Sequence, residues 1–93
     1  MNKENLIEKI EAITEELTEV YNKYVELTIK FETYKIANID YTIRDSIEKQ
    51  LGKLMQSDNS FKELHLEVEK LRRTRDLKKI QLDAYKTILN KLD

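Results

Sequence analysis

The chain has 93 residues and a net charge of −1, with 38% charged and 40% hydrophobic residues, one glycine, no proline and no cysteine. This composition excludes disulfide bonds, thiolate metal sites and glycine-rich phosphate loops, and it is too apolar for simple disorder. Because helix-breaking residues are almost absent, we expect residues 1–93 to form a single all-α domain.

The first predicted helix spans about residues 6–36 and carries a heptad seam. Its apolar residues alternate spacings of four and three over four heptads, which is typical of a coiled-coil arm. Asn5, followed by Glu8, predicts a cap at the helix start. The seam consists of Leu6, Ile10, Ile13, Leu17, Val20, Tyr24, Leu27, Phe31 and Tyr34. The apolar residues that this seam leaves exposed are Ile7, Tyr21, Val25 and Ile29.

A turn and a short helix are predicted in the middle of the chain. Asn38, Asp40 and Thr42 can bond to nearby backbone, which favours a turn at residues 37–42. The short helix should cover about residues 42–55, and its apolar face would comprise Ile43, Ile47, Leu51 and Leu54.

The third predicted helix spans about residues 61–91 and follows a second loop at residues 57–60. Ser60 with Glu63 is typical of a capping box at its start. Its heptad frame consists of Phe61, Leu64, Val68, Leu71, Leu82, Tyr85, Leu89 and Leu92. That frame places Arg75 and Lys78 at two core positions, after which a second apolar stripe begins. The second stripe consists of Leu77, Ile80, Ala84 and Ile88.

The first and third helices have similar lengths and complementary charge. Residues 1–41 carry five lysines against nine acidic residues, whereas residues 61–93 carry nine basic residues against six acidic ones. We therefore predict a long antiparallel helical hairpin, a coiled coil with the short helix near its tip; the compact alternative is a three-helix bundle. The surplus apolar stripes predict a homodimer or a protein partner that covers them.

Residues 70–79, KLRRTRDLKK, hold six basic residues and one acidic residue. Three interpretations remain open for this segment: a device that sets the register of the hairpin, a surface for a protein partner, and a surface for nucleic acid. Nucleic acid ranks last, because the cations do not form one stripe on a helical wheel and no aromatic residues interleave. The candidate partner-binding residues are Lys70, Arg72, Arg73, Arg75 and Lys79.

If these cations set the register, each should face a specific residue of the first helix. If the two long helices pair antiparallel, with the start of each beside the end of the other, Lys78 lies opposite Glu19. Lys70 or Arg72 then lies near Glu26. The same alignment brings Arg75 close to two aromatic rings, where cation–π contact becomes available. Those rings belong to Tyr21 and Tyr24.

Groups that could support catalysis or hold a metal are sparse. We therefore expect that the protein is not an enzyme and that it binds neither a cofactor nor a metal. His65 is the only histidine, and no Glu-x-x-His pair exists. The segment ELTIKFETYKIANIDY is similar in cadence to the first-helix exit of small all-helical chorismate mutases. Those enzymes bind their dicarboxylate substrate with arginines, and residues 1–43 contain no arginine.

We expect a cytoplasmic protein with no membrane contact, because no apolar run resembles a signal peptide core or reaches 18 residues. The segments TIRDSIEKQLGKLM, NSFKELHLEVEKLRR and DAYKTILNKLD resemble small coiled-coil accessory proteins of phages and mobile elements of low-GC Gram-positive bacteria. The resemblance implies a non-catalytic protein that binds a protein or a protein–nucleic-acid complex in a bacterial host. Such a protein would inhibit a host nuclease or a CRISPR effector. The alternatives are a recombination accessory factor that binds single-stranded nucleic acid and a purely structural, self-associating coiled coil.

Overall fold

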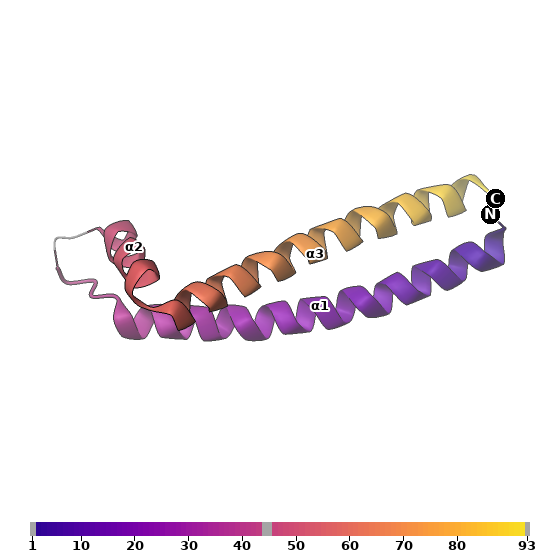
Figure 1. The fold of residues 1–93 in the computed structure, drawn as a ribbon. Coiled ribbons are helices and arrows are strands. Elements are labelled where there is room, and N and C mark those ends of the chain that lie inside the picture. The colour runs from indigo at the N-terminus through magenta and orange to yellow at the C-terminus, as the bar shows by residue number, and fades with distance from the viewer. Residues whose placement is uncertain (1, 44–45, 93) are drawn as a thin grey trace.

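The computed structural model describes residues 2–43 and 46–92, which form two long antiparallel helices with a short helix at their far end (Figure 1). The helices are α1 (Lys3–Asn38), α2 (Ile47–Ser57) and α3 (Asn59–Lys91). The molecule measures 60 × 20 × 18 Å, and its radius of gyration is 19.2 Å, whereas a compact chain of this length has about 12 Å. The predicted all-α hairpin with a short middle helix is confirmed, and its extended shape differs from that of a compact three-helix bundle.

Helix α1 begins earlier in the chain than the heptad pattern predicts. The Asn2 side chain accepts a hydrogen bond of 2.8 Å from the backbone N–H of Asn5 and so caps α1 at Lys3. The predicted cap at Asn5 is therefore wrong, because an asparagine three residues upstream already satisfies its backbone donor. The helix ends where the backbone N–H of Ile39 donates to the Lys35 carbonyl at 2.9 Å.

A hydrogen-bonded turn follows α1, as the local polar residues predict. The Asp40 carboxylate accepts from the Thr42 backbone N–H at 2.8 Å and from the Thr42 hydroxyl at 2.6 Å. These hydrogen bonds, the hydroxyl one above all, lower the pKa of the Asp40 carboxyl. The Gln50 side chain also bonds to the backbone N–H and carbonyl of Asp40, each at 2.8 Å, and so ties the turn to α2.

Because this turn holds Thr42 outside helical conformation, α2 begins at Ile47 rather than at residue 42. Ser46 caps it by accepting a hydrogen bond of 3.1 Å from the backbone N–H of Lys49. Residues 44–45, which the predicted helix included, lie outside the described residues.

Asp58 alone separates α2 from α3. Its backbone N–H donates to the Leu54 carbonyl at 2.9 Å and ends α2, while its carboxylate accepts from the Phe61 backbone N–H at 3.1 Å and caps α3. The other carboxylate oxygen accepts a hydrogen bond from the hydroxyl of Tyr34 on α1. One side chain therefore starts α3 and joins it to α1.

The predicted loop at residues 57–60 and the predicted capping box are both wrong. Ser60 lies within the first turn of α3, because Asp58 offers a cap two residues earlier. An aspartate bonds the free N–H groups of a helix start at least as well as a serine does. Glu63 therefore lies beyond the position that a capping box would require.

The core lies between α1 and α3 and includes an aromatic cluster near the tip of the hairpin. Phe61 is only 1% exposed, and its ring stacks on those of Phe31 and Tyr34, with centroid distances of 4.9 Å and 5.2 Å. His65 is half-buried, and its ring centroid lies 5.5 Å from that of Phe31. The side chains that are buried among the described residues are Leu6, Ile13, Ile39, Phe61, Val68 and Leu82.

The register between α1 and α3 differs from the predicted one by a helical turn at one contact and agrees at another. The Lys78 ammonium lies 2.7 Å from the carboxylate of Glu16, not from that of Glu19. The guanidinium of Arg75 lies 4.7 Å from the ring centroid of Tyr24, as predicted. Both contacts join the middle of α3 to α1, as an antiparallel hairpin requires.

One buried hydroxyl on α1 leads to a first prediction. The Thr28 hydroxyl is buried and has no hydrogen-bond partner within the described part of the chain. Because an unbonded buried polar group costs free energy, Thr28→Val should leave the free energy of unfolding unchanged or raise it by up to about 1 kcal/mol. Urea denaturation followed by circular dichroism measures the change. Thr14→Val is the control, because the exposed Thr14 hydroxyl donates to the Ile10 carbonyl, and a loss at Thr28 would contradict the prediction.

Candidate interaction surface

The five candidate partner-binding residues do not share one face of α3, and Arg72 is already paired. Its guanidinium lies 2.7 Å from the Glu69 carboxylate and 3.6 Å from that of Asp76, both on the same helix. The hydrogen bond from Arg72 lowers the pKa of Glu69, and the same bond raises the pKa of Arg72. Glu26, which the predicted register placed near Arg72, instead pairs with Lys30 at 3.7 Å.

Arg75 points toward α1 rather than toward solvent. Its side chain is 21% exposed, it lies over the Tyr24 ring, and it forms an ion pair of 3.1 Å with Asp76. Together with the Lys78–Glu16 ion pair, this contact links the middle of α3 to α1. Arg75 and Lys78 therefore contribute contacts between the two long helices of the hairpin.

Lys70 and Arg73 lie on the side of α3 that faces away from α1. They line a shallow hollow together with Leu66 and Leu77, and its remaining residues are His65, Glu69 and Thr74. No ion pair reaches Lys70 from the part of the chain that the structure describes. Lys79 lies about 160° around the helix from Leu77, so it belongs to a different face.

The hollow is part of a longer stripe, which we term the outer stripe of α3. Its residues recur at near-heptad spacing along the helix and combine five apolar side chains with three basic ones. The stripe consists of Leu66, Lys70, Arg73, Leu77, Ile80, Ala84, Ile88 and Lys91. Leu77 and Ile80 are each 66% exposed, and Leu66 is 56% exposed. The sequence predicted the part from Leu77 to Ile88, and the same spacing counted backward would have reached Leu66.

Helix α1 carries a corresponding exposed stripe, which we term the outer stripe of α1. Ile29 is 61% exposed and Ile36 is 65% exposed. The predicted exposure of Ile7, Tyr21, Val25 and Ile29 is confirmed. The stripe consists of Ile7, Glu11, Thr14, Thr18, Tyr21, Val25, Ile29, Glu32 and Ile36.

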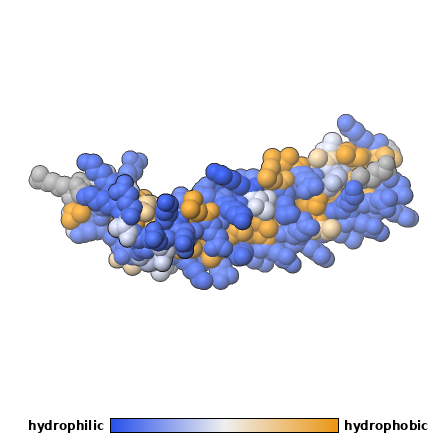
Figure 2. All heavy atoms as spheres, viewed as in Figure 1, coloured by the Kyte–Doolittle hydropathy of each residue, from blue (hydrophilic) through white to orange (hydrophobic). Residues whose placement is uncertain are grey.

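The two stripes lie on an elongated molecule with a large total surface. Its accessible area is 7073 Å², whereas a globular monomer of this mass exposes about 5,700 Å². Figure 2 shows hydrophobic atoms at the surface along both long helices, including over the half of α3 that leads to the C-terminus. Large apolar side chains exposed side by side along a helix are typical of surfaces that bind other proteins.

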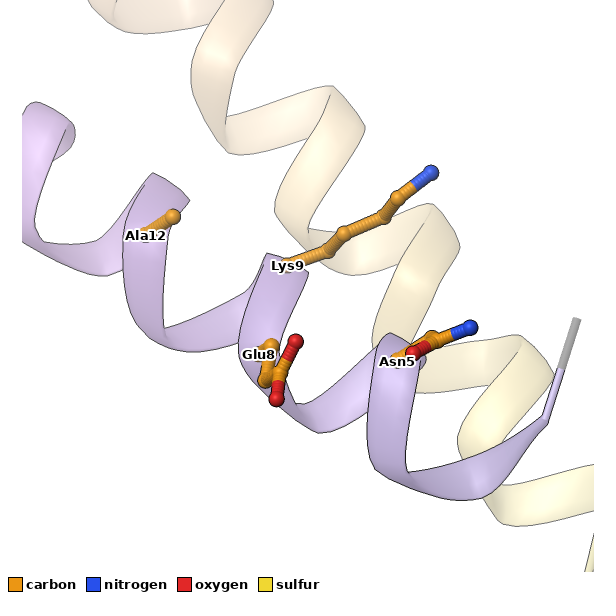
Figure 3. A pocket seen from close by; sticks show the side chains of 4 residues that line it. All are labelled: Asn5, Glu8, Lys9 and Ala12. Atoms are coloured by element: carbon orange, nitrogen blue, oxygen red, sulfur yellow. The ribbon is translucent and has the colours of Figure 1, made fainter.

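Another surface hollow lies near the start of α1. The hollow in Figure 3 is lined by Asn5, Glu8, Lys9 and Ala12, which come from successive turns of α1 alone. Lys9 extends toward α3, where its ammonium lies 5.8 Å from the ring centroid of Tyr85. Across residues 2–43 and 46–92, no three His, Asp or Glu side chains gather as metal ligands would.

A comparison with protein families, with characterised proteins and with solved structures finds no match to this chain. Within the described residues, none of the helices combines the length and the apolarity that crossing a membrane requires.

Proposed function

We propose that this protein is a non-catalytic helical interaction protein whose outer stripe of α3 binds an amphipathic helix of a protein partner. The observation that carries the proposal is the continuous stripe of exposed apolar and basic side chains along α3. Leu77 and Ile80 would be covered by apolar side chains of the partner, while Lys70 and Arg73 would meet its carboxylates. In the setting that the sequence resemblance implies, the partner would be a host nuclease or a CRISPR effector.

The distribution of charge favours a protein partner over single-stranded nucleic acid. A protein that binds through phosphate contacts needs several free cations that can reach the phosphates together. In the basic segment, Arg72, Arg75 and Lys78 already lie beside carboxylates of this chain. The cations of the outer stripe, Lys70, Arg73 and Lys91, lie on either side of a run of apolar side chains. That run suits an apolar surface better than a phosphate backbone.

Affinity capture with a matched pair of variants tests the proposal. The wild-type protein should retain a protein from a nuclease-treated lysate of a low-GC bacterium, and the double variant Leu77→Gln, Ile80→Gln should lose it. The control is Ile43→Gln, Ile47→Gln, which makes the same chemical change near the tip, where these residues are 47% and 43% exposed. Both variants should melt at the wild-type temperature, since all four side chains are exposed.

Two results would overturn this function. One is capture that the control variant loses as completely as the outer-stripe variant does. The other is tight binding of a labelled single-stranded oligonucleotide that falls steeply with salt, because that dependence is the signature of phosphate contacts.

A further inference from the structure

We propose that a second copy of this chain supplies the helix that covers the outer stripe of α3, and that it does so with the outer stripe of its own α1. This inference rests on the proposed function, because it concerns the same surface: a second copy covers the stripe while the other protein partner is absent. It starts from the match between the two stripes in length, spacing and charge.

The basic positions of one stripe match the acidic positions of the other. Lys70 and Lys91 are 21 residues apart, and Glu11 and Glu32 are also 21 residues apart. Three heptads separate both pairs, so both pairs of charges meet in a single register. All four side chains are exposed, and no ion pair is formed by Lys70, Lys91 or Glu11 within the described residues.

A parallel alignment with an offset of 59 residues brings every layer of the two stripes into phase. Lys70 then pairs with Glu11 of the second copy, and Lys91 pairs with Glu32. Each stripe departs once from heptad spacing, with a step of four residues where three are expected. This step runs from residue 84 to 88 in α3 and from 25 to 29 in α1, so it falls at the same layer in both. The layers that lie between or beyond the charges pair Leu66 with Ile7, Arg73 with Thr14, Leu77 with Thr18, Ile80 with Tyr21, Ala84 with Val25, and Ile88 with Ile29.

The direction of the two stripes determines how copies would assemble. At 100° per residue, Leu77 lies about 160° from the buried face of α3, whereas Val25 lies only about 110° from the buried face of α1. The stripes of one molecule therefore face different neighbours, and the contact is head-to-tail rather than self-complementary. Such contacts form rings or open chains of molecules, so association should continue beyond a dimer.

Exchanging the charges tests this register directly. The first variant is Lys70→Glu, Lys91→Glu, and the second is Glu11→Lys, Glu32→Lys. At low ionic strength, the weight-average mass of the wild type in analytical ultracentrifugation should rise with concentration above the 11.2 kDa monomer. Each variant alone should need at least about tenfold more protein to associate, because like charges then face each other. Mixing the two variants should restore association, since every charged layer is again complementary.

A charge-matched control is Lys79→Glu, Lys86→Glu, which makes the same change of charge on exposed residues outside the stripe. It should associate as the wild type does. The inference is overturned if the wild type stays monomeric at all concentrations, if the charge-exchanged variants associate normally, or if their mixture does not recover. A misfolded variant does not obscure the result, because the four exchanges combined in one chain should also restore association.

These outcomes separate this inference from the function on which it rests. A monomeric wild type whose captured protein is lost with Leu77→Gln, Ile80→Gln would end the second-copy proposal and leave the proposed function standing. If that double variant changes neither capture nor self-association, both proposals fail.

Discussion

Replacing Phe61 with alanine should lower the free energy of unfolding by about 3–5 kcal/mol, the range for removing a fully buried aromatic ring. Phe61 is 1% exposed and stacks on the rings of Phe31 and Tyr34. Among the described residues, Phe61 and Leu6 are the most completely buried large side chains. The cavity would therefore open at one of the best-packed points of the molecule. Urea denaturation followed by circular dichroism at 222 nm would measure the loss.

Leu66→Ala is the control for this prediction, because Leu66 is an apolar residue on the same helix but is 56% exposed. It should cost less than about 1 kcal/mol, since truncating an exposed side chain leaves no cavity. Equal losses at Phe61 and Leu66 would mean that the aromatic cluster does not hold the tip of the hairpin together.

Replacing Asp58 with alanine should lower the free energy of unfolding by about 2 kcal/mol. Removal of a helix N-cap costs about 1 kcal/mol, and loss of the hydrogen bond from the Tyr34 hydroxyl adds about 1 kcal/mol. Both interactions involve the same carboxylate, which accepts from the Phe61 backbone N–H and from Tyr34. Thermal and urea denaturation of Asp58→Ala would measure the combined effect.

Two further variants separate these contributions. Asp58→Asn keeps a good capping side chain and should cost less than Asp58→Ala does. Tyr34→Phe removes only the hydroxyl and should cost about 1 kcal/mol. If Asp58→Ala were no more destabilising than Tyr34→Phe, the carboxylate would not be acting as the cap of α3.

The hairpin was predictable because its seams repeat over many turns. Leu6, Ile13 and the other seam residues of α1 specify one buried face, and a similar frame from Phe61 onward specifies the other. The helix ends were not predictable from that periodicity. At both starts a polar residue two or three positions upstream caps the helix, Asn2 in place of Asn5 and Asp58 in place of Ser60.

The candidate surface was predictable only in part, because a cation at a heptad position suits two different environments. Arg75 occupies a seam position and points inward over Tyr24, whereas Arg73, only two residues away, faces outward beside Leu77. Which of them meets a partner depends on where α1 lies. The sequence predicted the contact of Arg75 with Tyr24 but placed Lys78 opposite the wrong glutamate. The exact register depends on the single-residue connection at Asp58 and on the stacked rings around Phe61.

The two long helices run antiparallel beside each other, so Asn2 and Leu92 lie at the same end of a molecule 60 Å long (Figure 1). A tensile force applied between the two chain ends would pull α1 and α3 apart as a zipper opens, loading only the outermost layer at any moment. The contacts of Leu6 and Lys9 would separate first, and the stacked rings near the tip would separate last. Attachment at the tip and at one end would instead shear all layers together, so the same protein should resist much larger forces in that direction.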